Sequence, residues 1–129
     1  MLLDVAAADP LDAVGPVTDE GGVVAARRVV ERVHADPALA RYVVGLVTAT
    51  RRDARMQLGG SPRAGLALLR AAKARALLER RGHALPEDVR ALAPTVLSHR
   101  MILTPDARAR GAAALEVVGD ALDAVPVPL

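Results

Sequence analysis

Hydrophobic residues recur every three or four positions along most of the chain after residue 18, which is the spacing of amphipathic helices. Thr18 and Asp19 can cap a first helix that ends near His34. Asp36 and Pro37 start a second helix, because the carboxylate accepts hydrogen bonds from free amides and proline lacks an amide hydrogen that would go unpaired there.

The same signals predict two further helices. Ser61 and Pro62 open a third helix, and Gly82 is suited to the left-handed conformation that often follows a helix end. Pro86 opens a fourth helix, and Pro94 is expected to kink or break it because proline cannot donate a hydrogen bond within the helix.

The last periodic segment predicts a helix over residues 112–124. No alternation with a period of two is long enough for a sheet, although residues near 100–103 can form one very short strand. The prediction is therefore an all-α fold, a small bundle of about four to five helices. Residues 18–129 are expected to form this helical domain, whereas residues 1–17, rich in turn formers, are expected to form an extended arm or linker.

Composition supports one small domain. The chain has 129 residues, one Tyr, no Phe or Trp, and a formal net charge of only +2, so bulk charge predicts no nucleic-acid partner. Cys is absent and the three His lie far apart in sequence, so no metal site is expected. The first residues do not resemble a signal peptide and no apolar run is long enough for a membrane span, which predicts a cytoplasmic protein without a membrane partner.

The segment LGGSPRAG is the main candidate for chemistry. Gly59 and Gly60 permit a sharp turn, Ser61 can cap the next helix and Pro62 can begin it. Arg63 then lies in the first turn, where the helix dipole disfavours a cation unless an anion is near. The amides and Arg63 could hold a phosphate, or Arg63 could simply be solvated.

No complete catalytic centre is apparent in the sequence. A phosphate-binding loop of the GxxxxGK[ST] type is missing, and no base is placed beside Ser61. Arg70 and Arg81 are most simply solvated. His99 and Arg100 could contact a neighbouring domain, or His99 could be a local helix cap.

Several motifs, in order, resemble the C-terminal lid of MoxR-type AAA+ ATPases. The resemblance covers residues 42–128 and rests on YVVGLVTATR, LGGSPRAGLALLRAAKARAL, LPEDVRALAPTVLSHRMIL and VPVP. DPLDAV, at residues 9–14, is similar to the link between such lids and their ATPase core. In this chain Gly60 stands where family members often have Ala.

The resemblance implies a function for the junction. Arg63 matches the sensor-2 arginine, which contacts ATP on the core and couples nucleotide state to lid position, with Gly59, Gly60, Ser61 and Pro62 as the supporting junction. The implied protein binds ATP and Mg²⁺ mainly through a core that this chain lacks, so no hydrolysis is expected from the chain alone. Implied partners are the core of the same or a neighbouring subunit, a homo-oligomeric ring and a protein with a von Willebrand factor A domain, in a chaperone-like remodelling reaction.

Two other functions remain open from the residues. A small basic helical module could bind nucleic acid through a set of cationic side chains, namely Arg63, Arg70, Lys73, Arg80 and Arg81. The lack of aromatic residues argues against that function. A plain protein-interaction domain would instead expose an apolar face and self-associate.

Overall fold

The computed structural model describes residues 13–128. Its elements, in chain order, are α1 (Glu20–Arg32), α2 (Pro37–Arg52), β1 (Met56–Leu58), α3 (Pro62–Leu78), α4 (Pro86–Leu97), the 3₁₀ turn η3 (Ser98–Arg100), β2 (Ile102–Leu103), α5 (Pro105–Ala109) and α6 (Ala114–Ala124). The predicted all-α class is confirmed, with six α-helices rather than four to five. No helix in the described part of the chain is long and apolar enough to cross a membrane.

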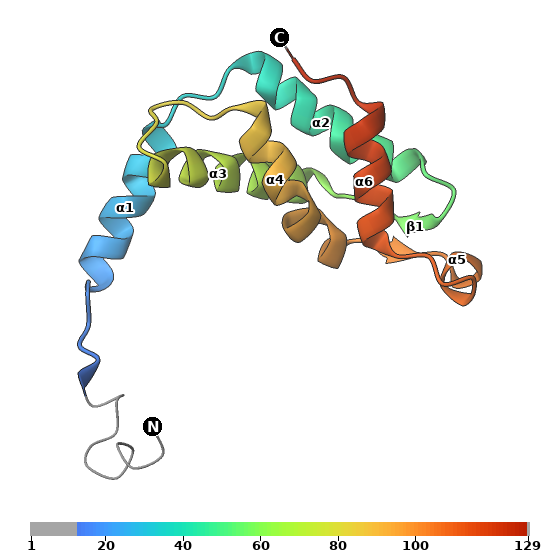
Figure 1. Ribbon diagram of the computed structural model, residues 1–129, viewed down its shortest axis with the longest axis horizontal. Helices are drawn as coiled ribbons and strands as arrows, with labels where there is room; N and C mark the ends of the chain where they lie inside the picture. Colours follow the sequence, from blue (N-terminus) through green and yellow to red (C-terminus); the bar gives the residue numbers. More distant parts are fainter. Residues whose placement is uncertain (1–12, 129) are drawn as a thin grey trace, which may run out of the picture.

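Helices α2, α3, α4 and α6 pack into a bundle, with α1 extending from one end and the β1–β2 ribbon and α5 at the other (Figure 1). The core is built from small aliphatic side chains, and its largest fully buried apolar members are Leu46, Leu68, Leu97, Val89, Val117 and Val118. Alanines on α3 and α4 are also fully buried, which lets these two helices approach closely.

Helix α1 begins as predicted, because the Asp19 carboxylate accepts a hydrogen bond from the amide of Gly22 at 2.7 Å. However, α1 buries none of its residues, and Val23 and Val29 are nearly half exposed. The predicted apolar face of α1 is therefore left largely uncovered by residues 13–128. Residues 13–17 are exposed and precede α1, while residues 1–12 of the predicted arm lie outside the described residues.

Two expectations about helix ends are wrong. The left-handed residue after α3 is Arg80, at φ 58°, and not Gly82. The amide of Arg81 donates to the carbonyl of Ala76, which closes the helix end two residues earlier than Gly82 would. Pro94 does not break α4, which continues to Leu97 because residues on both sides of the proline are fully buried in the core.

The predicted short strand near 100–103 is present as β2. It pairs antiparallel with β1, a strand that was not predicted because three residues are too few to show a period. Helix α5 begins with the Thr104 hydroxyl accepting from the amide of Ala107 at 3.2 Å. Helix α6, predicted over residues 112–124, begins at Ala114; Val117 and Val118 are buried in it, whereas Leu115 is exposed.

Candidate functional site at the start of helix α3

The LGGSPRAG junction lies at the start of α3, as predicted. The Ser61 hydroxyl accepts a hydrogen bond from the amide of Ala64 at 3.1 Å, and Pro62 occupies the first helical position. Arg63 is exposed in the first turn, and the described residues offer its guanidinium neither a hydrogen bond nor an ion pair. The predicted geometry of a cation beside a helix N-terminus is therefore present.

The junction is hydrogen-bonded to the end of α2. Thr50 is fully buried, and its hydroxyl accepts from the amide of Gly60 at 3.0 Å while donating to the carbonyl of Val47 at 2.8 Å. Arg51 Nε donates to the carbonyl of Gly60 at 2.6 Å. Both backbone groups of Gly60 are thus held by consecutive residues of α2.

Glycine is required at position 59 because of this close approach. A Cβ on Gly59 would lie 2.6 Å from the Cα of Arg51 and 2.8 Å from the carbonyl carbon of Thr50. At Gly60 the space is less tight, with the nearest atom, the Thr50 hydroxyl oxygen, at 3.2 Å. An alanine at position 60 would therefore need only a small shift of that hydroxyl.

Sequence reasoning missed the roles of Thr50 and Arg51. Thr50 is buried on α2 and Arg51 is exposed at the end of the same helix, and both bind Gly60. The only sequence signal was a hydroxyl at a buried helical position, since such a group needs a partner.

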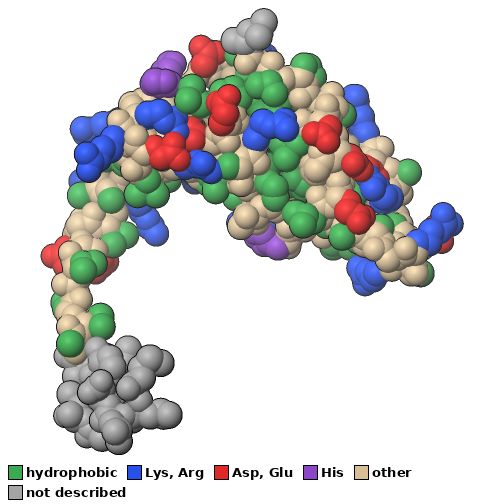
Figure 2. Space-filling view, in the orientation of Figure 1, with side chains coloured by type: hydrophobic (Ala, Val, Ile, Leu, Met, Phe, Trp, Pro, Cys, Tyr) green, Lys and Arg blue, Asp and Glu red, His purple; other side chains and the backbone are tan. Residues whose placement is uncertain are grey.

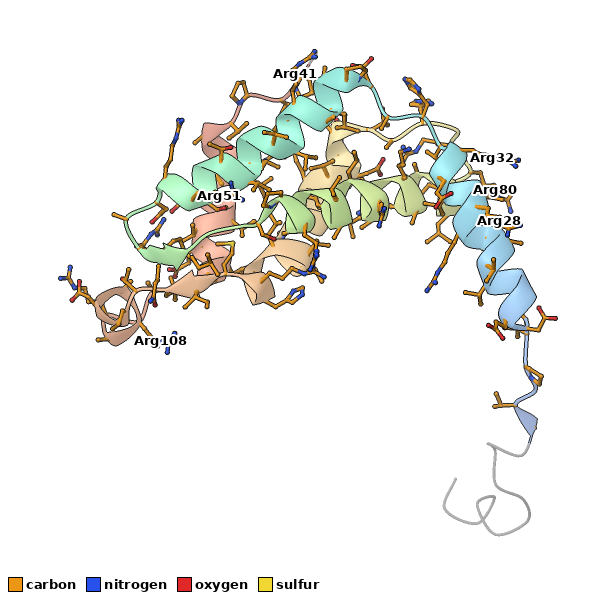
Figure 3. All side chains as sticks on the ribbon, turned by 180° about the vertical axis from the view of Figure 1, so that it is seen from behind. Arg28, Arg32, Arg41, Arg51, Arg80 and Arg108 are labelled. Carbon is orange, nitrogen blue, oxygen red and sulfur yellow. The ribbon has the colours of Figure 1, made fainter. Side chains whose placement is uncertain are left out.

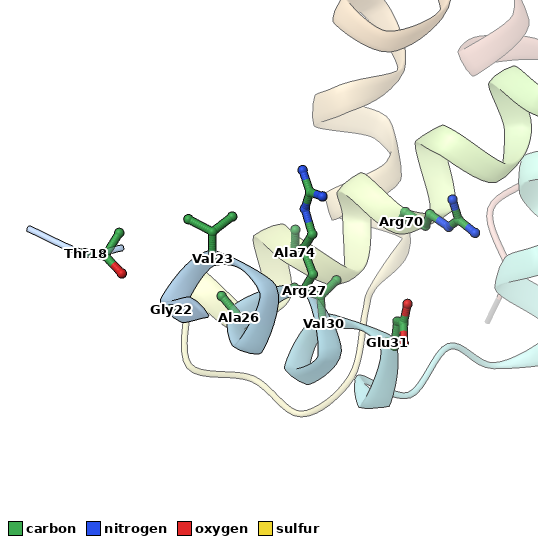
Figure 4. A pocket seen from close by; sticks show the side chains of 9 residues that line it. All are labelled: Thr18, Gly22, Val23, Ala26, Arg27, Val30, Glu31, Arg70 and Ala74. Carbon is green, nitrogen blue, oxygen red and sulfur yellow. The ribbon is translucent and has the colours of Figure 1, made fainter. Parts of the chain in front are cut away.

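Further along α3, this helix and α1 form a shallow groove of about 610 Å³. Figure 4 shows Val23 and Val30 of α1 at this groove, together with Arg70 and Ala74 of α3. At 100° per residue, Arg63 and Arg70 project from the same side of α3. Arg70 at this groove therefore lies about 10 Å further along the same side of α3 than Arg63.

Arg81 does not fit the expectation of a solvated side chain. Its guanidinium donates to both carboxylate oxygens of Asp88, at 2.9 and 2.7 Å, and Asp88 is 1% exposed. The Asp88 carboxylate also accepts from the amide of Leu85 at 2.9 Å. Arg81 therefore links the turn between α3 and α4 to the start of α4 through an ion pair with Asp88.

His99 and Arg100 are both exposed on η3. His99 Nδ1 lies 2.8 Å from the carbonyl oxygen of Thr95, and Arg100 Nε donates to His99 Nε2 at 3.2 Å. These contacts are compatible with His99 as a local helix cap, and a contact of His99 and Arg100 with another domain stays a prediction.

Comparison with known proteins gives a family match. The model of the AAA lid domain matches residues 48–121, which include the whole junction and α3. An uncharacterized protein, YeaC of Bacillus subtilis, is 39% identical over 120 residues, which cover 93% of this chain and 38% of that protein.

Proteins named MoxR are also similar. MoxR of Paracoccus denitrificans is 42% identical over 109 residues, covering 74% of this chain and 32% of that protein. The protein named chaperone MoxR1 of Mycobacterium tuberculosis is 37% identical over 100 residues, covering 70% of this chain and 26% of that protein. The chain thus spans between a quarter and two fifths of the length of these relatives.

A solved structure of a candidate ATPase from Cytophaga hutchinsonii has the same fold. It superposes with a TM-score of 0.79 at 31% sequence identity, covering 84% of this chain and 36% of that chain. The similarity therefore extends beyond the segment that the family model matches.

Proposed function

The chain belongs to the AAA lid domain family, and on that premise we propose that it is the lid of a MoxR-type AAA+ ATPase in which Arg63 contacts nucleotide bound on the ATPase core. The observation that carries this proposal is the exposed, unpaired Arg63 in the first turn of α3, within the part of the chain that the structure describes. The helix N-terminus and the guanidinium together favour an anion such as a phosphate.

The junction suits a role in coupling as well as binding. Because Thr50 and Arg51 hold Gly60, a force on the start of α3 is transmitted directly to the end of α2. When ATP is on the core, Arg63 binds its phosphates and the lid adopts one position; after hydrolysis the contact weakens and the lid is released. The lid contributes position and charge, while ATP and Mg²⁺ are bound mainly by the core.

The exposed apolar face of α1 is suited to contact with a neighbouring domain. Val23 and Val29 are 44% and 45% exposed, and they lie on the helix that leads from the predicted linker into the bundle. An apolar helix face of this kind is usually covered in the assembled protein. We propose that the ATPase core covers it, in a ring of identical subunits that remodels a partner such as a von Willebrand factor A domain protein in the cytoplasm.

Two of the five cationic side chains named for binding of nucleic acid are held by partners within the domain. Arg81 is paired with Asp88 and Glu79, and Lys73 Nζ donates to the carbonyl of Glu31 at 3.2 Å. Side chains that are held by internal partners are less available for phosphates.

The test joins this chain to a matching ATPase core and compares ATP turnover of the unchanged protein with Arg63→Ala and Arg63→Lys. Arg70→Ala is the matched control, since Arg70 is exposed on the same helix. Loss of turnover with Arg63→Ala, partial rescue with Arg63→Lys and little change with Arg70→Ala are expected. Unchanged turnover and nucleotide affinity in Arg63→Ala, with helicity intact by circular dichroism, would remove Arg63 from this role.

A further inference from the structure

Arg80 occupies a backbone conformation that disfavours its side chain. It is the only non-glycine residue with positive φ in the described part of the chain, at φ 58°. The amides of Arg80 and Arg81 donate to the carbonyls of Leu77 and Ala76, at 2.9 and 2.8 Å, which is the helix-ending pattern that glycine usually completes. The backbone conformation at this position therefore favours glycine over the arginine that occupies it.

The turn that carries Arg80 lies beside the end of α1. The amide of His34 donates to the carbonyl of Gly82, and the amide of Ala84 donates to the carbonyl of His34, both at 2.9 Å. Arg32, two residues before His34, therefore lies on a segment adjoining Arg80. Arg28 is one helical turn before Arg32 and shares its face of α1.

The figures show these three side chains on one flank of the molecule. In Figure 3, Arg28, Arg32 and Arg80 lie close together in projection at the outer side of α1. Figure 2 shows Lys and Arg side chains gathered where α1 meets the end of α3. We call the set Arg28, Arg32 and Arg80 the arginine patch.

Near the end of α3, acidic residues pair with Arg75 and Arg81 but not with the arginines of the patch. Glu79 pairs with Arg75 at 3.0 Å and with Arg81 at 2.7 Å, and Asp88 is also bound by Arg81. Among residues 13–128, by contrast, no hydrogen bond or ion pair is found for the side chain of any patch arginine, and all three are exposed. The helix dipole of α1 favours Arg32 in its last turn, but it accounts for neither Arg28 nor Arg80.

We propose that the arginine patch is a docking site for an acidic segment of a protein partner. Guanidinium groups bind carboxylates in pairs of parallel hydrogen bonds, and the three that are unpaired among residues 13–128 provide positive charge for such contacts. A protein partner is favoured over nucleic acid because the patch is small, the net charge is only +2, and the chain has a single aromatic residue on which a base could stack.

This site is separate from the junction. Arg63 is at the start and Arg80 beyond the end of α3, a 17-residue helix that at 1.5 Å per residue is about 26 Å long. Binding of an acidic segment at the arginine patch does not depend on the contact proposed between Arg63 and nucleotide, so each can be tested without the other.

The test measures binding of a fluorescent 12-residue peptide of alternating Asp and Glu to the full 129-residue chain by fluorescence anisotropy at low salt. The patch variant carries Arg28→Ala, Arg32→Ala and Arg80→Gly. Its affinity should fall about tenfold, since three exposed charge pairs are lost. Arg80→Gly is chosen because glycine suits the left-handed conformation, so loss of binding cannot be attributed to a strained fold.

A second variant with the same loss of charge is the control, with Arg41→Ala, Arg52→Ala and Arg108→Ala at exposed positions. Figure 3 shows Arg41 and Arg108 away from the patch. The control should bind within about twofold of the unchanged chain. An equal loss in both variants, or no loss in the patch variant, would overturn the proposal. A 12-base-pair DNA duplex that binds more tightly than the peptide and needs the same three arginines would also overturn it, in favour of a nucleic-acid site.

Discussion

The amide of Gly60 donates a 3.0 Å hydrogen bond to the hydroxyl of Thr50, which is fully buried in the bundle. The bond joins the end of α2 to the residue that precedes the Ser61 cap of α3. The position of Arg63 therefore depends on a helix that ends more than ten residues before it.

Thr50→Val should destabilise the domain because valine keeps the shape of threonine but leaves the Gly60 amide without its partner. The expected loss is about 1–3 kcal/mol in the free energy of unfolding, measured by urea denaturation. Thr50→Ser keeps the hydroxyl and loses one methyl group, at about 1 kcal/mol. A Thr50→Val protein as stable as the unchanged one would show that this hydrogen bond is dispensable.

Gly59→Ala should also destabilise the junction, for a steric reason. The new Cβ would lie 2.6 Å from the Cα of Arg51, a backbone atom that cannot rotate away. We expect a loss of about 1–3 kcal/mol by thermal or urea unfolding. Gly82→Ala is the control, since a Cβ there meets no atom within 4 Å, and it should be neutral or slightly stabilising. Equal effects at the two positions would contradict the close approach at Gly59.

Helix starts could be predicted from sequence because their causes are local. Asp19, Asp36, Ser61 and Thr104 each accept a hydrogen bond from an amide two or three residues later. The candidate site followed for the same reason, since the Ser-Pro-Arg order alone fixes Arg63 in the first turn of α3.

Contacts between distant segments could not be predicted in this way. Arg81 and Asp88 are charged residues that a local pattern assigns to the surface, yet they meet because α3 and α4 turn back on each other. Pro94 was expected to kink or break α4, but the helix continues past it because burial of the residues around it outweighs the lost hydrogen bond. In both cases packing decides against the local preference.

Asp88 should make stability depend on pH. Burial acts to raise the pKa of Asp88, but hydrogen bonds from Arg81 and the Leu85 amide, with the charges of Arg81 and Arg75, outweigh it and lower that pKa. Because the folded pKa is below the unfolded one, the stabilisation is present above the unfolded value of about 3.9 and is lost as pH falls through the folded value.

Asp88→Asn should therefore lower the free energy of unfolding by about 1–3 kcal/mol at pH 7, and this difference should shrink below about pH 4. Urea unfolding over a pH series measures both effects. Glu87→Gln, one residue earlier in the first turn of α4, is the control and should change stability by less than about 1 kcal/mol. A difference between Asp88→Asn and the unchanged chain that is constant down to pH 2 would contradict the ion-pair account.

Arg80→Gly should stabilise the domain, because glycine adopts the left-handed conformation at φ 58° without steric cost. A gain of about 1 kcal/mol in the free energy of unfolding is expected. Gly111→Ala makes the opposite change at φ 81°, where no atom lies within 4 Å of the new Cβ, and should cost about 1 kcal/mol through the backbone alone. If Arg80→Gly lowers stability instead, the arginine makes a stabilising contact that outweighs its backbone strain.

Arg63→Glu should separate stability from function at the proposed nucleotide contact. In the isolated chain a carboxylate in the first turn of α3 complements the helix dipole that the arginine opposes, so stability should rise by about 0.3–1 kcal/mol. In the chain joined to an ATPase core, the same variant should lose turnover, because the carboxylate repels the nucleotide phosphates. Arg70→Glu, seven residues further along α3, lies beyond the range of the dipole and should leave stability nearly unchanged. A gain in stability accompanied by full turnover would contradict the proposed contact between Arg63 and the nucleotide phosphates.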